Sequence, residues 1–224
     1  MAASMESPTS PAFLQSATYI DSGHPAIVDY ARQHVQPGDS PLDMAVRLYY
    51  VVRDGWRYDP YQLDFRPDKM PASALLARSK GHCVEKATLY AALCRAVGIP
   101  SRLRFANVRN HIGTARLEEF LGSNLLVFHG MVEVAPEGQW VKATPAFNKE
   151  LCAHLGVQPL EFDGRTDSVF QEYDPQAGRF MQYEHDYGAF EDLPRALMID
   201  SLKSHYGHLF APERIAAFGM TVHL

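Results

Sequence analysis

Gly-His-Cys-Val-Glu-Lys-Ala (residues 81–87) stands where a loop turns into a long apolar helix. Beyond its first turn, the predicted helix over residues 83–97 carries Arg95 as its single charged side chain. A helix that is apolar on nearly all sides is a buried helix. Gly98 fits the C-cap of this helix, because glycine readily adopts the left-handed conformation found there. The sequence therefore predicts a central buried helix with Cys83 in its first turn.

A histidine lies on a predicted strand downstream of this helix. Residues 126–134 read Leu-Val-Phe-His-Gly-Met-Val-Glu-Val, and the β-branched and aromatic neighbours of His129 are typical of a strand. Residues 139–144 are predicted to return as the second strand of a hairpin across Ala-Pro-Glu-Gly at 135–138. A thiol at a helix start and an imidazole on a strand are the minimum equipment of a cysteine nucleophile and its base. Thiol-dependent acyl transfer or hydrolysis is therefore the leading hypothesis.

Hydrophobic spacing predicts several further helices and one further strand. Helices are expected over residues 25–34, 41–53, 73–77, 148–155 and 193–206, a strand over 101–108, and an aromatic loop or short strand over 56–61. Residues 180–190, rich in aromatic and carboxylate side chains, are expected to form a loop packed over the core or, alternatively, a lid over the substrate cleft. Helices come first and strands cluster later, so we predict an α+β fold with an antiparallel sheet packed on the central helix.

Composition excludes several classes of protein. The chain has 224 residues, 46% hydrophobic and 21% charged, which is ample for a globular core. A net charge of −5 without a basic stripe argues against nucleic acid as a partner. No run approaches the roughly 18 apolar residues that cross a bilayer, so no membrane partner is expected. Residues 1–12 lack the features of a secretory signal and are expected to form a disordered tail, and a cytoplasmic location is expected.

The three cysteines do not suggest a disulfide framework or a metal knuckle. Their odd number argues against extracellular disulfides, and none forms a Cys-x-x-Cys pair that would bind structural zinc. Cys94 and Cys152 are expected to be inert core residues. No cofactor is predicted, and no calcium loop is present in the sequence. A metal site is kept as a minor alternative, built from Cys83, His82, His111 and His129.

A free thiol is mostly protonated at pH 7, so the nucleophile must be stabilised as a thiolate. The unpaired N–H groups and positive dipole end of a helix N-terminus supply roughly 0.3–1 kcal/mol of this stabilisation. An imidazolium at His129 is expected to add to it and then to protonate the leaving group. Glu85 opposes the thiolate, and Lys80 and Lys86 are expected to offset Glu85. The backbone N–H of Cys83 is available as one oxyanion contact, because first-turn amides lack helical partners.

Three further residues are candidates for the substrate cleft. Trp56 and Tyr58 are placed to line the cleft or to donate a second oxyanion contact, although simple packing explains each of them as well. His82, directly before the cysteine, is expected to be a local hydrogen-bonding residue at the substrate or oxyanion site.

Residues 81–102 resemble the core of the transglutaminase-like superfamily. Residues 128–134 and 139–145 resemble its histidine strand and the strand that follows, and Tyr-Asp-Pro at 58–60 also fits. The resemblance covers about residues 45–150 and implies a papain-like fold with a Cys-His-Asp triad, with Cys83 as nucleophile and His129 as base. Members of the family include protein crosslinkers, peptidases and amide-cleaving glycanases. We expect residues 13–224 to form a single transglutaminase-like domain with a C-terminal extension over 151–224.

The third triad position departs from the family pattern. The usual aspartate falls just before a proline, where this chain has Thr144. A threonine hydroxyl accepts a hydrogen bond from an imidazole but carries no charge. Asn148 is the first substitute, because a neutral asparagine orients the histidine in papain-like enzymes. Asp163, reaching back from a later loop, is the second.

These features predict an enzyme that attacks a carboxamide or peptide carbonyl through a thioester intermediate. Water or a second amine then resolves the thioester, with hydrolysis as the safer expectation. The expected substrate is a peptide, a protein or a small amide, and the oligomeric state is not predicted. The alternative is a degenerate, non-catalytic binding domain that keeps the fold, which Thr144 motivates.

Overall fold

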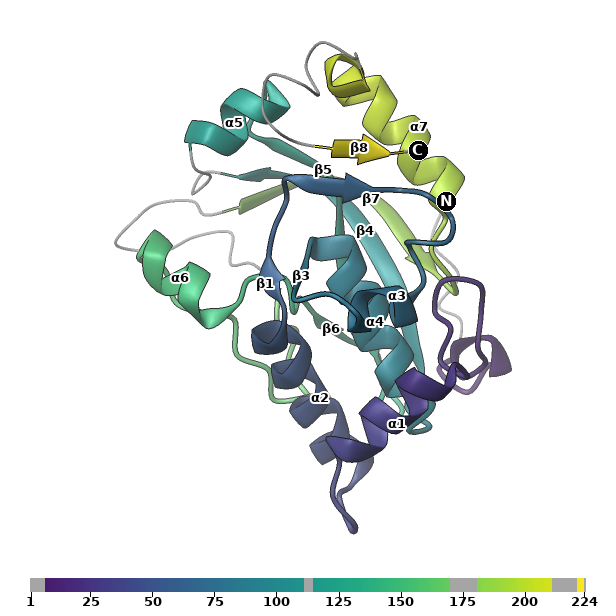
Figure 1. Ribbon diagram of the computed structural model, residues 1–224. Helices are drawn as coiled ribbons and strands as arrows, with labels where there is room; N and C mark the ends of the chain where they lie inside the picture. The colour runs from purple at the N-terminus through teal and green to yellow at the C-terminus, as the bar shows by residue number, and fades with distance from the viewer. Residues whose placement is uncertain (1–6, 111–114, 170–180, 211–220, 224) are drawn as a thin grey trace.

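A four-stranded antiparallel sheet packed against a buried helix forms the centre of the protein (Figure 1). The computed structural model describes residues 7–110, 115–169, 181–210 and 221–223. The sheet has the order β6 (Val141–Ala143), β5 (Leu125–Val134), β4 (Ser101–Asn110) and β7 (Met181–Phe190). The buried helix is α4 (Cys83–Ala96), which packs against β5 and β4. This arrangement confirms the predicted α+β class and the antiparallel sheet on a central helix.

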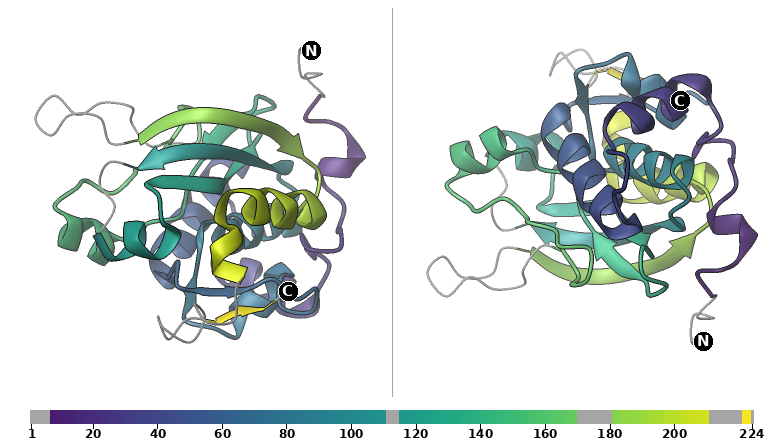
Figure 2. Two further views of the ribbon diagram at one scale, coloured as in Figure 1. Left: turned by 90° about the horizontal axis from the view of Figure 1, so that it is seen from above. Right: turned by 90° about the horizontal axis from the view of Figure 1, so that it is seen from below.

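Three helices surround the side of α4 that faces away from the sheet. They are α1 (Pro25–Gln33), α2 (Pro41–Gly55) and α3 (Ala72–Leu76), and α2 and α4 lie on the same side of the sheet (Figure 2). Ser40 is the N-cap residue of α2, and its side-chain oxygen accepts a hydrogen bond from the Asp43 N–H at 3.2 Å. The Asp43 carboxylate accepts in return from the Ser40 N–H, which completes a capping box at the predicted start.

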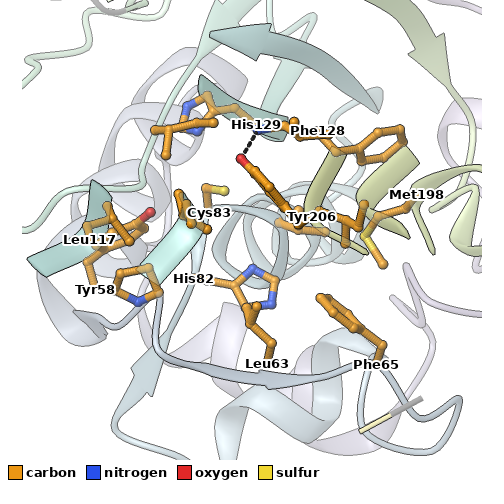
Figure 3. Close-up of a pocket in the computed structure, with 16 residues that line it drawn as sticks. Tyr58, Leu63, Phe65, His82, Cys83, Leu117, Phe128, His129, Met198 and Tyr206 are labelled. Atoms are coloured by element: carbon orange, nitrogen blue, oxygen red, sulfur yellow. Dashed lines mark hydrogen bonds between the residues drawn. The ribbon is translucent and has the colours of Figure 1, made fainter. Parts of the chain in front are cut away.

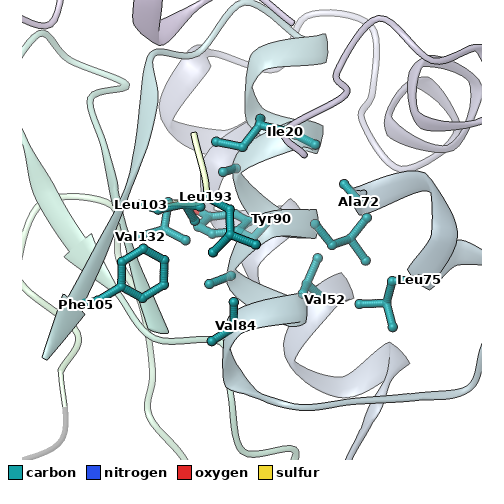
Figure 4. Close-up of a cluster of buried hydrophobic side chains, with 14 of the residues drawn as sticks. Ile20, Val52, Ala72, Leu75, Val84, Tyr90, Leu103, Phe105, Val132 and Leu193 are labelled. Carbon is teal, nitrogen blue, oxygen red and sulfur yellow. The ribbon is translucent and has the colours of Figure 1, made fainter. Parts of the chain in front are cut away.

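Helix α4 is buried along its length, as its sequence predicts. Every residue from Val84 to Arg95 is buried, so both the sheet and the helices use it as a packing surface. Tyr90 of α4 lies with Leu103, Phe105 and Val132 of the sheet in one hydrophobic cluster (Figure 4). This packing holds the first turn of α4, and Cys83 with it, in a fixed position against β5.

Shorter elements complete the fold around this centre. Two parallel pairs join β1 (Arg57–Tyr58) to β3 (Lys80–Gly81) and β2 (Gln62–Asp64) to β8 (Thr221–His223). The remaining α-helices are α5 (Ala115–Leu121), α6 (Lys149–Leu155) and α7 (Arg195–Tyr206). Short 3-10 helices occupy Pro11–Phe13 and Gly207–Phe210. The first six residues of the predicted tail lie outside the described residues, and the division into tail, core and extension stays a prediction.

The prediction for residues 180–190 was wrong. Most of this segment, expected to be a loop or lid, is strand β7, which pairs antiparallel with β4 at the edge of the sheet. Cross-strand ion pairs explain why its charged side chains suit a strand. Arg109 of β4 pairs with Glu184 at 2.5 Å, and Arg104 pairs with Asp186. The helix α5 was also not anticipated, whereas the hairpin of β5 and β6 is confirmed.

Within the ranges that the structure describes, the helices are all too short or too polar to cross a lipid bilayer.

Candidate active site

Cys83 is the first residue of α4, and the chain reaches it in an extended conformation. The N-cap residue His82 has φ −88° and ψ 177°, and its backbone N–H donates to the Glu85 carboxylate at 3.0 Å. This hydrogen bond satisfies one amide at the helix start and fixes where the helix begins. Cys83 itself is half-buried, whereas Cys94 and Cys152 are buried. Cys83, at the start of α4, is therefore the least buried of the three cysteines.

The charge of Glu85 is balanced by a residue that the sequence did not indicate. Arg78 pairs with Glu85 at 2.7 Å, whereas Lys80 pairs with Asp59 at 3.2 Å. Lys86 is fully buried and donates to three backbone carbonyls instead, those of Arg53, Trp56 and Ala146. The expectation that Lys80 and Lys86 offset Glu85 was therefore wrong, because both ammonium groups are held by other acceptors.

A glycine brings the histidine strand against the first turn of α4. Gly130 follows His129 on β5, and a Cβ on Gly130 would lie 2.9 Å from the Cα and 3.2 Å from the N of Val84. Real side chains do not approach a backbone this closely, so only glycine permits the contact. Since Gly130 follows His129 and Val84 follows Cys83, this contact fixes the histidine and the cysteine relative to each other.

A β-bulge sits directly before His129. Two residues of β5, Val127 and Phe128, lie opposite one residue of β4, Asn107. Phe128 has a φ of 60°, a left-handed conformation that is strained for a bulky side chain. The Asn107 side-chain oxygen accepts from the Phe128 N–H at 3.0 Å, and the Tyr206 hydroxyl accepts from the Val127 N–H at 2.9 Å. These two acceptors satisfy the amides that the bulge removes from the strand pairing.

Cys83 and His129 line one cavity, which has a volume of about 70 Å³ (Figure 3). His82 and Tyr58 line the same cavity, so four of the predicted site residues come together there. The two predicted catalytic side chains thus meet at a shared cavity rather than on separate faces of the molecule.

Burial sets the protonation of the two groups at rest. It raises the pKa of the Cys83 thiol to about 11, although backbone N–H groups of Gly130, Val84 and Cys83 act in the opposite direction. Burial lowers the pKa of His129 to about 4. Both groups are therefore neutral at pH 7. Loss of solvent thus opposes the resting thiolate that the sequence predicts, and it outweighs the effect of the first-turn amides.

Three predicted cleft residues take different positions. Trp56 is buried, its indole N–H donates to the Leu75 carbonyl at 3.0 Å, and it is not part of the cavity lining. Tyr58 lines the cavity and packs its ring against Phe147 at 4.8 Å. His82 also lines the cavity, with its Nε2 atom 3.5 Å from the Glu85 carboxylate. Tyr58 and His82 therefore lie at the cavity, whereas the Trp56 indole N–H already donates to a backbone carbonyl.

Asn148 and Asp163 are each engaged in other contacts. The Asn148 side-chain oxygen accepts from the Tyr58 N–H at 3.0 Å, and its amide nitrogen donates to Glu150 at 2.6 Å.

Asp163 lies in an exposed loop and accepts from the hydroxyl and N–H of Thr166 and the N–H of Arg165. These bonds, with that of the Thr166 hydroxyl first, lower the pKa of Asp163 to about 2. Neither residue lines the cavity that Cys83 and His129 share.

Thr144 lies directly after β6, the strand that pairs with β5. Its backbone carbonyl accepts from the Tyr49 hydroxyl at 3.2 Å, and the residue is 1% exposed. In the described part of the chain, its hydroxyl oxygen is buried and makes no hydrogen bond. A buried hydroxyl without a partner costs stability, so this oxygen is the uncommitted polar atom among the three candidates for the third position.

The metal alternative finds no ligand cluster in the described ranges. No group of three or more His, Cys, Asp or Glu side chains there is arranged to hold a metal ion. One of the four residues proposed for that site, His111, lies outside the described residues.

Sequence reasoning missed three residues that position the site: Gly130, Asn107 and Tyr206. A glycine inside a predicted strand does signal close backbone approach, so Gly130 could have been found beside His129. Asn107 and Tyr206 gave no such signal, because each acts through a contact with a distant segment, 21 and 79 residues away in sequence.

Comparison with known proteins gives the same family as the sequence resemblance. The family model described as "Transglutaminase-like superfamily" matches residues 28–145. The fold is similar to a solved structure from Cytophaga hutchinsonii, provisionally described as a cysteine protease, with a TM-score of 0.51 and 15% sequence identity. That match covers 83% of this chain and 48% of the other, so this chain spans about half the length of that protein. A comparison with curated proteins found no match. Because the family model covers more than half of the sequence, the chain belongs to the transglutaminase-like superfamily.

Proposed function

We propose that the protein is a cysteine-dependent amide or peptide hydrolase or acyltransferase, with Cys83 as nucleophile and His129 as base. The observation that carries this proposal is the shared cavity, which both side chains line where Gly130 brings β5 against α4. A nucleophile and a base at one accessible cavity are the minimum requirement for acyl transfer through a covalent intermediate.

The reaction begins from a neutral pair. When a substrate carbonyl binds, His129 takes the Cys83 proton as the sulfur–carbon bond forms. The imidazolium then protonates the leaving nitrogen as the carbon–nitrogen bond breaks, which leaves a thioester on Cys83. Water or a second amine attacks the thioester carbonyl and His129 accepts the proton of that nucleophile. His129 then passes this proton to the departing sulfur as the carbon–sulfur bond breaks, which regenerates the Cys83 thiol.

The backbone amides around the sulfur stabilise the charge that develops in this step. The N–H groups of Gly130, Val84 and Cys83 favour the thiolate. Cys83 and Val84 lie in the first turn of α4, where amides lack helical partners. Fixed N–H donors of this kind stabilise developing negative charge without reorganisation. Tyr58, which lines the cavity, is the proposed side-chain donor for the oxyanion.

Thr144 is the proposed third residue of the site. Its buried hydroxyl is uncommitted in the described part of the chain, whereas Asn148 and Asp163 have other partners. A hydroxyl orients an imidazole but adds no charge, which agrees with the lowered pKa of His129. This hydroxyl, which makes no hydrogen bond in the described part of the chain, is proposed to orient His129 as a neutral group in place of a carboxylate.

Release of p-nitrophenolate from p-nitrophenyl acetate tests the proposal. The native protein is expected to release the phenolate with a burst and to form hydroxamate when hydroxylamine is present. Cys83→Ala should abolish both signals, His129→Gln should slow the burst at least about 100-fold, and Cys152→Ala should leave it unchanged. Thr144→Val should slow it less than His129→Gln does, without loss of folding. Equal rates for the native protein and Cys83→Ala would overturn the proposal.

A second candidate is a binding domain that keeps the cavity without chemistry. The neutral resting pair and the threonine at the carboxylate position favour it. In that case no phenolate burst occurs and Cys83→Ala retains affinity for the same small ligands.

A further inference from the structure

The cavity beside Cys83 is lined mostly by apolar side chains. Among its sixteen lining residues, all in the described part of the chain, there is no Asp, Glu, Lys or Arg. Its polar members are Cys83, two histidines and two tyrosines. We propose, building on the proposed function, that this cavity binds an uncharged apolar acyl group of the substrate and that helix α7 sets the size of that group.

Helix α7 supplies one wall of the cavity. Met198, Leu202 and Tyr206 are four residues apart and therefore share one face of the helix. All three line the cavity and are 1%, 8% and 4% exposed, respectively. In Figure 3, Tyr206 lies next to Cys83, and Met198 lies on the far side of Tyr206. Leu197 of the same helix is 40% exposed and does not belong to the lining.

The position of α7 is fixed relative to the histidine strand. The Tyr206 hydroxyl accepts from the Val127 N–H at 2.9 Å and donates to the Leu125 carbonyl. The wall is thus anchored to β5 two residues before His129, so its distance from the reacting sulfur is set by the fold. This helix lies beyond residues 28–145, the part that matches the family. The segment that limits the acyl group is therefore not part of the shared family core.

Apolar lining favours one chemical class of acyl group. Each methylene buried against such a wall is expected to raise kcat/KM about fourfold until the cavity is full. A carboxylate or ammonium in the same place would lose its hydration without gaining a partner. With about 70 Å³ available, chains beyond a limited length no longer fit, and the residues of α7 determine that limit.

A series of p-nitrophenyl esters tests the inference through chemistry. In each case the Cys83 sulfur bonds to the acyl carbon, its proton passes to His129, and p-nitrophenolate leaves with the carbon–oxygen bond. From acetate to butyrate to hexanoate, kcat/KM should rise and then fall, and valerate should exceed the charged hemiglutarate at least about tenfold. Met198→Ala and Leu202→Ala should move the optimum to longer chains, and the matched control Leu197→Ala should not. Rate ratios within one protein do not depend on the fraction folded.

A second series tests the cavity without catalysis. Alkyl methanethiosulfonates transfer a thioalkyl group to Cys83 with loss of methanesulfinate, and the adduct is measured by intact mass against Cys83→Ala. Butyl and hexyl reagents should react faster than the anionic sulfonatoethyl reagent, beyond the ratio measured with free cysteine. This preference without ester turnover would support the inference and reject the proposed function. Ester turnover without a chain-length or charge preference, or an optimum unmoved in both α7 variants, would overturn the inference and leave the proposed function standing.

Discussion

Gly130 and Val84 approach so closely that a Cβ on Gly130 would lie 2.9 Å from the Val84 Cα. Each is the residue that directly follows a proposed catalytic residue, His129 and Cys83. The contact joins β5 to the first turn of α4, so the packing of these two elements fixes the position of His129 relative to Cys83. The geometry of the catalytic pair therefore depends on the absence of a side chain at one position.

Gly130→Ala is expected to destabilise the protein and to damage the site. The added methyl group must push β5 away from the α4 backbone, at a cost of about 1–3 kcal/mol in the free energy of unfolding. Acylation of Cys83 should slow by more than the folded fraction explains, because His129 moves with the strand. Urea unfolding and ester hydrolysis measure the two effects. The matched control is Gly55→Ala, at an exposed position with no atom within 4 Å of the added methyl group. Similar losses in the two variants would contradict this account of the contact.

Stability is expected to fall as pH is lowered, through His129. The pKa of this residue is about 4 in the folded protein and near 6.5 when the chain is unfolded. Its contribution to stability is therefore complete above about pH 6.5 and is lost as the pH falls towards 4. Between pH 7.5 and pH 5, this residue alone should lower the free energy of unfolding by about 2 kcal/mol.

The measurement is urea unfolding of the native protein and of His129→Gln at both pH values. The variant should show the smaller decrease, and the exposed-site control His205→Gln should behave as the native protein does. A decrease of the same size in His129→Gln would show that another group causes it.

Cys83 is expected to react with iodoacetamide before Cys94 and Cys152, but slowly at neutral pH. With a thiol pKa of about 11, roughly one molecule in ten thousand carries the thiolate at pH 7. The alkylation rate should therefore rise about tenfold for each pH unit up to the limit of stability. Peptide mapping with time measures the rate at each cysteine. A rate that is already constant between pH 6 and pH 8 would instead indicate a preformed thiolate–imidazolium pair.

Lys86→Met is expected to destabilise the fold without altering the reacting groups. The lysine donates to carbonyls of Arg53, Trp56 and Ala146 at 2.9, 2.8 and 2.7 Å. Its removal leaves three buried acceptors, each at a cost of about 1–3 kcal/mol, so a loss of at least about 3 kcal/mol is expected. Lys80→Met is the control, because the Lys80 side chain is 36% exposed and its pair with Asp59 contributes at most about 1 kcal/mol. Thermal unfolding of the two variants decides whether the carbonyl contacts matter.

The local parts of the fold could be predicted from sequence, and the long-range parts could not. The apolar run of α4, the cap at Ser40 and the β-branched and aromatic residues of β5 are local signals, and the structure confirms all three elements. Strand β7 was missed because its charged residues suit a strand only once they can pair with Arg104 and Arg109 of the neighbouring strand β4. In that case the partner strand, rather than the local pattern, decides the structure.

The candidate site shows the same division. Cys83 and His129 were identified from their immediate neighbours, and the structure brings both to one cavity. Their protonation at rest could not be predicted locally, since the cost of removing solvent depends on residues contributed by the whole fold. The wall formed by Met198 and Leu202 was not foreseen either, because nothing in the sequence of α7 indicates which element it faces.

Intact-mass and peptide analysis of the acyl-enzyme is the most direct test of the catalytic assignment. After a brief reaction with p-nitrophenyl butyrate and an acid quench, a single butyryl group should be present on the peptide that contains Cys83. The adduct should be absent in Cys83→Ala and should form much more slowly in His129→Gln. A butyryl group on Cys152, or on no cysteine while phenolate is still released, would contradict the account.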